Sequence, residues 1–171
     1  MANKKTRWLN TGQQRAWRAY MLGTTQLMAQ LDRDLNAEHG LSLPEYEILV
    51  RLSEAPELRM RMAELADSLN HSRSRLTHTV ARMEIAGLVT RESCGTDRRG
   101  VYAFLTEAGV QRLADAAPVH VAGVRRYLVD AMSAEDLEAV GRAFTAVAEV
   151  LGDGKAWPLG EEHPRHKTAQ R

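Results

Sequence analysis

The stretch "SRSRLTHTVARMEIAGLV", residues 72–89, is rich in arginine and hydroxyl side chains and ends in an apolar segment with one glycine. Four residues share one face at helical spacing, and that face must be the buried one: Leu76, Thr79, Val80 and Met83. The opposite face carries Arg73, Ser74, Thr77, His78, Ala81 and Arg82. Ser72 is positioned to cap the helix, because a serine hydroxyl accepts a hydrogen bond from a backbone N–H of the first turn. The stretch therefore predicts a helix with a basic, hydroxylic outer face.

A shorter helix is predicted immediately before this one. In "MRMAELADSL", residues 60–69, the apolar side chains recur at helical spacing at Met62, Leu65, Ala66 and Leu69. The following "NHS" is a tight turn, in which Asn70 can adopt the left-handed conformation that such a turn often needs. A helix, a tight turn and a second helix with a basic outer face form the helix-turn-helix arrangement.

After Gly87 the hydrophobic period changes from 3.6 to about 2. The segments "LVTRES", "CGTDRRG" and "VYAFLT", residues 88–106, predict a strand, a turn with a basic tip and a returning strand. A β-hairpin directly after a recognition helix is a wing, and its arginines can enter the neighbouring minor groove, where the negative potential is enhanced. The sequence therefore predicts a winged helix-turn-helix.

The charge along this middle segment favours double-stranded DNA as the partner. The chain has a net charge of only +1, but between residues 59 and 99 eight arginines stand against five acidic residues. Arg75 lies at the edge of the outer face, where it could contact a phosphate or pair with Glu84 or Asp67. The predicted DNA-binding residues are Ser72, Arg73, Ser74, Arg75, Thr77, His78, Arg82, Arg98 and Arg99.

Long helices are predicted on both sides of the winged segment. Their N-terminal caps are expected at Thr11 (with Gln14 in a capping box), Ser42, Thr106 and Ser133. Gly40 should end the first helix, and Pro118 should bend a later one. The helices over 12–38, 107–130 and 134–151 carry apolar stripes that could pack within one chain. We favour an intertwined homodimer, because the middle segment is too short to cover all three stripes.

Other classes of protein fit the sequence less well. A nucleophile elbow, a glycine-rich phosphate loop and a paired-carboxylate motif are missing, so we expect neither an enzyme nor a cofactor. The "HPRH" of the tail has a possible metal-binding spacing but no structured partners or soft ligands nearby, and His71 and His78 are too far apart to share an ion, so we expect no metal site. The N-terminus lacks a signal-peptide core, no apolar run is long enough to span a membrane, and Cys94 is a single cysteine. These features predict a cytoplasmic protein.

The order "LSLPEYEILVRL…MRMAELADSL…SRSRLTHTVARMEIAGLV…DRRGVYAFLTEAG" resembles the MarR family (multiple antibiotic resistance regulators), over about residues 11–150 and most strongly over 62–109. The resemblance implies a homodimer with interlocked terminal helices, recognition helices in successive major grooves, and wing contacts from Arg98 and Arg99. It also implies that Asp97 anchors the wing through an arginine, and that a small molecule or an oxidant alters the spacing of the two helices. Arg61 departs from the family pattern, which often has a Ser or Thr cap there. The turn departs too, since Asn70-His71 replaces a glycine and an apolar residue.

These observations together predict a mostly α fold, a winged helix-turn-helix with long N- and C-terminal dimerisation helices. The expected regions are 1–40 and 107–151 for dimerisation, 41–106 for DNA binding, and a disordered tail at 152–171. The expected function is a repressor that a small-molecule effector releases from a pseudo-palindromic operator. A redox-responsive regulator using Cys94 and a protein-interaction module without DNA binding are the alternatives. The stripe of Trp17, Tyr20, Met21 and Met28 is interpreted as ordinary core, and the family-implied alternative is a ligand pocket beside it.

Overall fold

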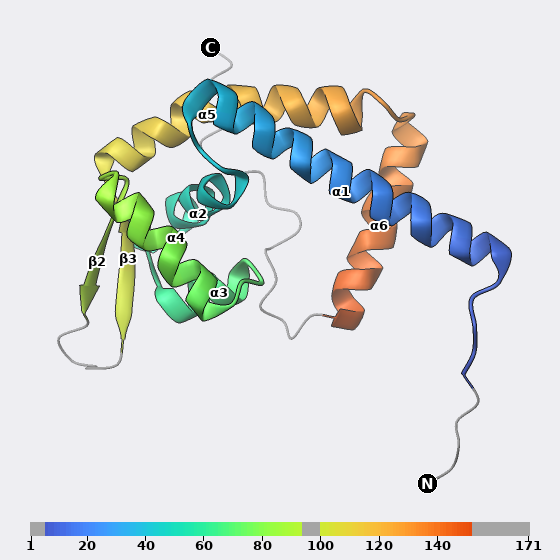
Figure 1. The fold of residues 1–171 in the computed structure, drawn as a ribbon, viewed down its shortest axis with the longest axis horizontal. Coiled ribbons are helices and arrows are strands. Elements are labelled where there is room, and N and C mark those ends of the chain that lie inside the picture. Colours follow the sequence, from blue (N-terminus) through green and yellow to red (C-terminus); the bar gives the residue numbers. More distant parts are fainter. Residues whose placement is uncertain (1–5, 94–99, 152–171) are drawn as a thin grey trace, which may run out of the picture.

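The computed structural model describes residues 6–93 and 100–151. The helices are α1 (Thr11–His39), α2 (Leu43–Glu54), α3 (Met62–Ser68), α4 (Arg73–Ile85), α5 (Glu107–Val124) and α6 (Ala134–Leu151). A short 3-10 turn (Pro56–Leu58) precedes the strands β1 (Arg59–Arg61), β2 (Val89–Ser93) and β3 (Val101–Leu105), and a π turn (Arg125–Val129) follows α5. In Figure 1, α1 and α5 run together above the winged helix-turn-helix. Helix α6 crosses α1 at a place that is distant from the winged helix-turn-helix. The predicted fold class is confirmed.

Three of the four predicted caps are confirmed. The Glu45 carboxylate accepts a hydrogen bond from the Ser42 backbone N–H at 3.0 Å. Thr106 Oγ1 accepts one from the Gly109 N–H at 3.0 Å, and Ser133 Oγ accepts one from the Asp136 N–H at 3.1 Å. Each cap satisfies an N–H group that the first helical turn leaves without an intrahelical partner.

The prediction of Thr11 as the first cap is wrong by one residue. Asn10 caps α1 instead: its Oδ1 accepts from the Gln13 N–H at 2.9 Å, and Gln13 Oε1 accepts from the Asn10 N–H at 3.0 Å. The two possible capping boxes overlap in sequence, and asparagine is a stronger cap than threonine. The other end agrees with the prediction, because α1 ends at Gly40 in the left-handed conformation, with φ of 60°.

The wing is part of a three-stranded antiparallel sheet in the order β1–β3–β2. β2 and β3 are the predicted hairpin strands, and Val89 lies opposite Leu105. β1 was not predicted, because a three-residue strand is too short to show an alternating pattern. It pairs with β3, with Arg59 opposite Phe104 and Arg61 opposite Tyr102.

The hydrophobic core is formed mainly by the winged helix-turn-helix itself, and α1 and α5 pack against it. Its fully buried members come from α1, α2, α3, α4 and β2: Leu35, Ile48, Leu49, Leu52, Leu65, Leu76, Val80, Met83 and Val89. Gly109 lets the first turn of α5 approach this core, because a Cβ there would lie 2.2 Å from the Leu88 carbonyl oxygen. The wing, the exit of α4 and the start of α5 are therefore packed as one unit.

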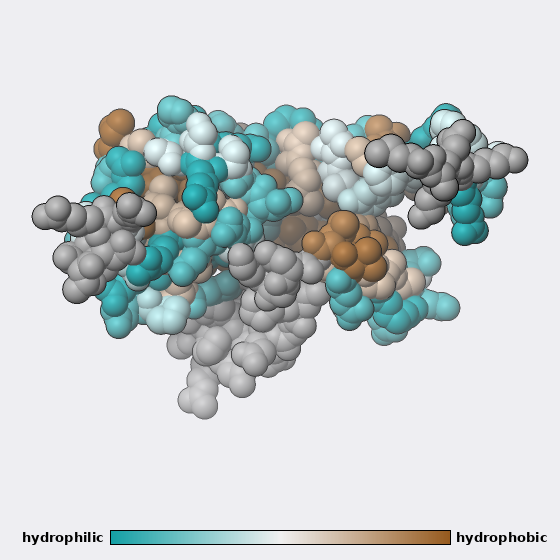
Figure 2. Space-filling model, turned by 90° about the horizontal axis from the view of Figure 1, so that it is seen from below, coloured by the Kyte–Doolittle hydropathy of each residue, from teal (hydrophilic) through white to brown (hydrophobic). Residues whose placement is uncertain are grey.

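The helices α1, α5 and α6, which form the helical half of the chain, are packed differently. No residue of α6 is buried, and the side chains of Phe144, Val147, Val150 and Leu151 are exposed. Figure 2 shows apolar side chains gathered over the end of this helix. The interpretation of Trp17, Tyr20, Met21 and Met28 as core of a single chain is wrong, since these side chains are between 39% and 54% exposed. Only Leu31 and Leu35 are buried in α1, at the end that meets α5.

Candidate DNA-binding surface

The turn between α3 and α4 has the predicted geometry. Asn70 adopts a left-handed conformation, with φ of 51°. The His71 backbone N–H donates to the Ala66 carbonyl at 2.9 Å, and the Asn70 N–H donates to the Asp67 carbonyl at 3.1 Å. These hydrogen bonds close α3 and fix the direction in which α4 leaves the turn.

The two faces of α4 are those that the sequence predicts. Ser72 Oγ accepts from the Arg75 N–H at 3.2 Å, so the predicted cap is present. The inner face is buried and consists of Leu76, Thr79, Val80 and Met83. The outer face is exposed at Arg73, Ser74, Thr77 and His78. Burial of one face therefore fixes which side chains point away from the protein.

The outer face offers both charge and hydrogen-bonding groups. Thr77 Oγ1 donates its proton to the Arg73 carbonyl at 2.7 Å, which leaves the hydroxyl oxygen as an acceptor and the methyl group for apolar contact. A base amino group and a thymine methyl are suitable partners for those two atoms. Arg73 and His78 add donors on the same exposed surface.

The structure shows which carboxylates lie near the arginines of α4. Arg82, predicted to contact DNA, has a partner within the chain: its Nη2 lies 3.3 Å from Glu45 Oε1 of α2. Glu84 does not pair with Arg75. It binds Arg91 of β2, accepting from the backbone N–H at 3.0 Å, from Nε at 2.9 Å and from Nη2 at 2.6 Å. These bonds lower the pKa of the Glu84 carboxyl and tie the wing to α4.

The tip of the wing lies outside the described residues, and with it Cys94, Asp97, Arg98 and Arg99. The tail at 152–171 lies outside them as well. At the root of the wing, Thr106 Oγ1 donates to the Gly87 carbonyl at 2.7 Å while accepting from α5. One side chain thus connects the exit of α4 with the start of α5.

A groove of about 250 Å³ lies between α4 and the wing. Its lining residues are Arg61, Met62, Ala63, Arg73, Thr77, Gly100 and Val101. Arg61 Nε donates to the Tyr102 hydroxyl at 3.0 Å across the β1–β3 pair. Neither Arg61 nor Tyr102 was predicted from the sequence as a site residue. The available signal was the basic "RMR" before the first helix of the motif, where Arg61 departs from the family pattern.

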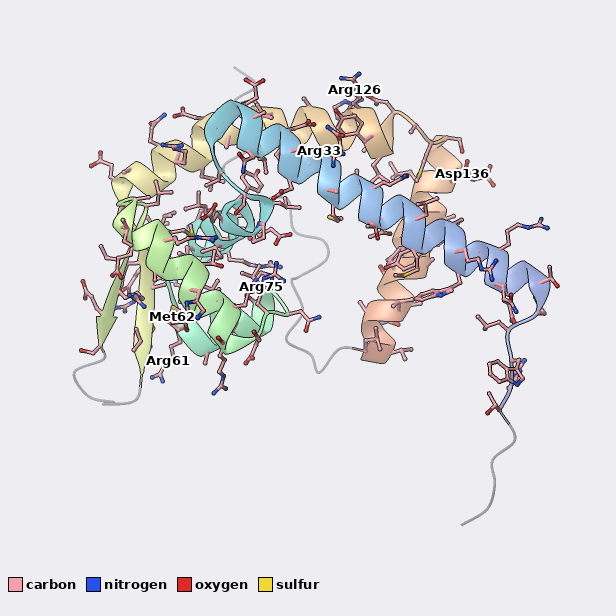
Figure 3. All side chains as sticks on the ribbon, viewed as in Figure 1. Arg33, Arg61, Met62, Arg75, Arg126 and Asp136 are labelled. Carbon is pink, nitrogen blue, oxygen red and sulfur yellow. The ribbon has the colours of Figure 1, made fainter. Side chains whose placement is uncertain are left out.

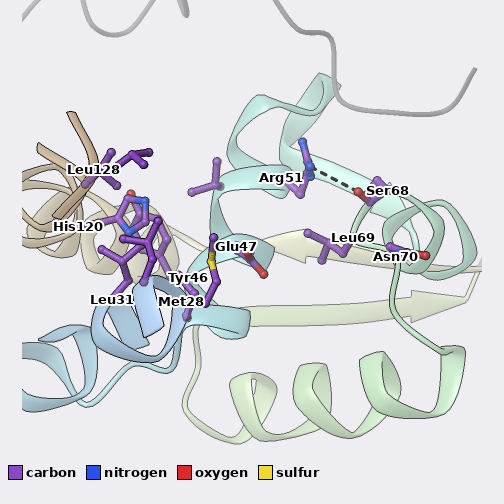
Figure 4. Close-up of a pocket in the computed structure, with 14 residues that line it drawn as sticks. Met28, Leu31, Tyr46, Glu47, Arg51, Ser68, Leu69, Asn70, His120 and Leu128 are labelled. Atoms are coloured by element: carbon purple, nitrogen blue, oxygen red, sulfur yellow. Dashed lines mark hydrogen bonds between the residues drawn. The ribbon is translucent and has the colours of Figure 1, made fainter. Parts of the chain in front are cut away.

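A larger cavity of about 480 Å³ lies between the helical half and the helix-turn-helix. Figure 4 shows Met28 and Leu31 of α1, Tyr46 of α2 and His120 of α5 at one end of it, with Ser68, Leu69 and Asn70 at the other. A cavity at this place matches the pocket that the family resemblance implies beside α1. It touches both the long helices and the α3–α4 turn.

The polar groups of the cavity are concentrated on α2 and α5. The rings of Tyr46 and His120 are 4.5 Å apart, and His120 Nδ1 is buried with no hydrogen-bond partner among the described residues. Burial lowers the pKa of His120 and raises the pKa of Tyr46. Burial also raises the pKa of Glu47, against the opposing charges of Arg51 and Arg75. The cavity can therefore accept an amphipathic molecule with a polar group directed at His120 Nδ1.

Neither a metal-binding cluster nor a membrane-spanning helix is found in the part of the chain that the structure describes. It contains no group of three or more histidine, cysteine or acidic residues that could hold a metal ion. Within the same residues, none of the helices is both long and apolar enough to cross a membrane.

A helix, a tight turn, a second helix with a basic exposed face and a β-hairpin packed against it define the winged helix-turn-helix class. The model of the MarR family matches residues 39–100. This chain is similar to AbsC, a MarR family transcriptional regulator from Streptomyces coelicolor whose crystal structure is known. The two sequences are 46% identical over 85% of this chain and 98% of AbsC, and the structures superpose with a TM-score of 0.79. Sco3205, a MarR family transcriptional regulator from the same organism solved in complex with DNA, is 41% identical. It covers 90% of this chain and 96% of its own, with a TM-score of 0.83.

A curated relative agrees with these structures. The HTH-type transcriptional regulator MhqR of Bacillus subtilis (strain 168) is 28% identical over 101 residues, which are 59% of this chain and 68% of MhqR. This chain belongs to the MarR family and is a transcriptional regulator.

Proposed function

We propose that this protein is a homodimeric repressor that binds a pseudo-palindromic DNA duplex and is released from it by a small-molecule effector. In this proposal residues 41–106 bind DNA, and residues 1–40 and 107–151 form the dimer. The carrying observation is the exposed basic and hydroxylic face of α4, held outward by its buried opposite face and flanked by the wing. The DNA complex of Sco3205 supports the same assignment.

The proposed contacts divide by chemistry. Ser74, Thr77 and His78 contact base edges in the major groove, where each base pair presents a distinct pattern of donors and acceptors. The remaining proposed residues contact phosphates or support those that do: Ser72, Arg73, Arg75, Arg82, Asp97, Arg98 and Arg99. Of these, Arg82 would exchange its ion pair with Glu45 for a phosphate. A 3.3 Å pair with a two-thirds-exposed arginine is weak enough for that exchange.

A second copy of the chain is the proposed partner for the helical half. Trp17, Tyr20 and Phe144 form a row of rings, with centroids 5.8 Å and 5.2 Å apart, and all three remain 39–54% exposed. Exposed aromatic side chains of this kind are enriched at the centres of interfaces. To bind a pseudo-palindromic duplex, the two α4 helices of such a dimer would lie about 34 Å apart, which is one turn of DNA.

The proposed effector binds in the 480 Å³ cavity. A ligand there would contact α1 and α5 on one side and the α3–α4 turn on the other. It can release DNA only if it binds more tightly to the dimer whose recognition helices do not fit the operator.

The DNA-binding part is tested on a duplex that the purified protein selects from a random library. With about four phosphate contacts per protomer, log affinity should fall against log salt concentration with a slope of about −7. Arg99→Ala should weaken binding to all duplexes and reduce the slope, whereas Arg33→Ala on α1 should not. His78→Ala should change the selected sequence. A flat salt response and no selected sequence would favour the protein-interaction alternative.

The effector part is tested by screening small aromatic compounds for release of that duplex. Val50→Trp fills the cavity from α2 and should abolish release while leaving DNA affinity unchanged. Release that persists in Val50→Trp would contradict the assignment of the cavity. Release by peroxide that is lost in Cys94→Ser would favour the redox-responsive alternative instead.

A further inference from the structure

The outer face of the three-stranded sheet carries an arrangement of arginine and aromatic side chains that the proposed contacts do not use. Arg59 and Arg61 are two residues apart on β1 and therefore point to the same side of the sheet. Tyr102 and Phe104 lie opposite them on β3. The guanidinium carbon of Arg61 lies 5.3 Å from the centre of the Tyr102 ring, and its Nε donates to the Tyr102 hydroxyl. The ring and the hydroxyl together hold the Arg61 side chain in one orientation.

Arg61 is thereby directed along the groove between the wing and α4. Figure 3 shows Arg61 and Met62 together near the start of β3, next to the start of α3. The opposite wall of the groove is formed by Arg73 and Thr77, which belong to the exposed face of α4. Two arginines and a hydroxyl group line the groove and present several hydrogen-bond donors to it. An anion with several acceptor oxygens matches this lining.

We propose that this groove binds a phosphate of the DNA backbone, with Arg61 as its ligand and Tyr102 as the residue that positions Arg61. The inference rests on the proposed DNA binding, since a duplex whose base edges meet Thr77 must carry one sugar–phosphate strand past this wall of α4. The arginine fork supplies donors in a plane that suits phosphate oxygens. The Tyr102 hydroxyl orients that fork before DNA arrives, which reduces the ordering cost of the contact.

Arg61→Gln is the decisive variant, measured with the library-selected duplex over a range of salt concentrations. We expect the affinity of the dimer to fall about tenfold or more and the salt slope to become less steep by about two, since each protomer loses one phosphate contact. The loss should be equal on unrelated duplexes, because phosphates carry no base information. Arg61→Lys should restore most of the slope but only part of the affinity.

Arg59→Gln is the matched control, because it removes the same charge from the same face of the same strand. Arg59 pairs with Glu57 at 2.6 Å, stacks over Tyr102 and Phe104, and does not line the groove. We expect its affinity to stay within about twofold of the original protein. Tyr102→Phe keeps the ring but removes the hydroxyl, so it should lower affinity several-fold while leaving the salt slope unchanged. Thermal unfolding of each variant checks that the fold is retained.

Replacing single phosphates by neutral methylphosphonates locates the contact. At one position, the replacement should weaken DNA binding by the original protein and have no further effect on DNA binding by Arg61→Gln. If the original protein binds with a steep salt slope but Arg61→Gln behaves like Arg59→Gln, this inference is overturned and the proposed function stands. If the original protein shows no salt-dependent binding to any duplex, the proposed function itself fails.

Discussion

The winged helix-turn-helix buries its apolar side chains within the chain, whereas the helical half leaves many of its apolar side chains exposed. Leu76, Val80 and Met83 of α4 are at most 1% exposed, and they pack within the chain. Phe144 and Val147 of α6 carry a similar helical stripe but are 42% and 47% exposed. The same pattern of apolar residues therefore ends in a closed core in one region and an open surface in the other.

The difference teaches how the two regions relate to function. A closed core fixes the orientation of α4 and its exposed face without help from another molecule. An exposed aromatic surface marks an interaction site, and we propose that a second copy of the chain covers it. The stability of the winged region should therefore be a property of one chain, and that of the helical half a property of the assembly.

The largest expected effect is on the open surface. Phe144→Asp should convert the dimer to a monomer, because a two-fold interface contains the residue twice and a buried charge replaces each ring. The association free energy should weaken by about 5 kcal/mol. Sedimentation velocity measures the change. Ala146→Asp, which adds the same charge on another side of α6, should leave a dimer. Equal behaviour of the two variants would contradict the assigned interface.

The next largest effect is expected within the closed core. Gly109→Ala forces a Cβ against the Leu88 carbonyl and the Leu105 side chain, so it should lower the free energy of unfolding by about 3 kcal/mol. Urea denaturation measures this loss. Gly23→Ala is the control in α1, where a Cβ meets nothing within 4 Å, and it should raise stability by about 0.5–1 kcal/mol. Similar values for both would mean that the close contact at Gly109 relaxes easily.

A smaller effect separates the caps of the two regions. Ser72→Ala removes the cap of α4, whose next turns are buried, and should lower the free energy of global unfolding by about 1 kcal/mol. Asn10→Ala removes the cap of α1 at an exposed end, which can fray without opening the core. We expect it to speed amide hydrogen exchange in the first turn of α1 and to change global unfolding less. An equal global loss for the two variants would show that the end of α1 unfolds together with the core.

The smallest effect is expected from pH at the boundary between the regions. Burial lowers the pKa of His120 in the folded protein, so below about pH 6.5 the unfolded chain binds a proton that the folded chain does not. Stability should therefore fall as the pH drops from 7.5 to 5.5. Burial also lowers the pKa of His71, which adds to the fall, whereas the raised pKa of Glu47 acts in the opposite direction.

His120→Phe keeps a ring against Tyr46 and should show a shallower fall than the original protein in urea denaturation at each pH. The difference between the two proteins isolates the histidine, since Glu47 and His71 are present in both. Ile48→Val is the control, because it should lower the free energy of unfolding by about 1 kcal/mol at every pH and leave its pH dependence unchanged. A His120→Phe curve parallel to that of the original protein would contradict a buried, neutral histidine.

The sequence predicted the features that local chemistry controls. The buried face of α4, the Ser72 cap, the left-handed Asn70 and the hairpin strands are all present, because each depends on residues within a few positions of one another. The strand β1 was missed, since its pairing with β3 joins residues about forty positions apart. The pairing of Arg82 with Glu45 was missed for the same reason, since 37 positions separate them. Glu84 and Arg91 are only seven positions apart, but they meet because β2 packs against α4 after the turn at Gly87.

By itself, therefore, the sequence of residues 72–89 determined which face of α4 is buried, because periodicity and burial of apolar surface act along one helix. Only the tertiary structure decided that Arg82 reaches Glu45, that Arg91 takes Glu84, and that Arg61 joins Arg73 along one groove. Hydrogen bonds and ion pairs act over a few ångströms, and the positions of distant segments at that scale follow from packing. Sequence spacing alone does not contain them.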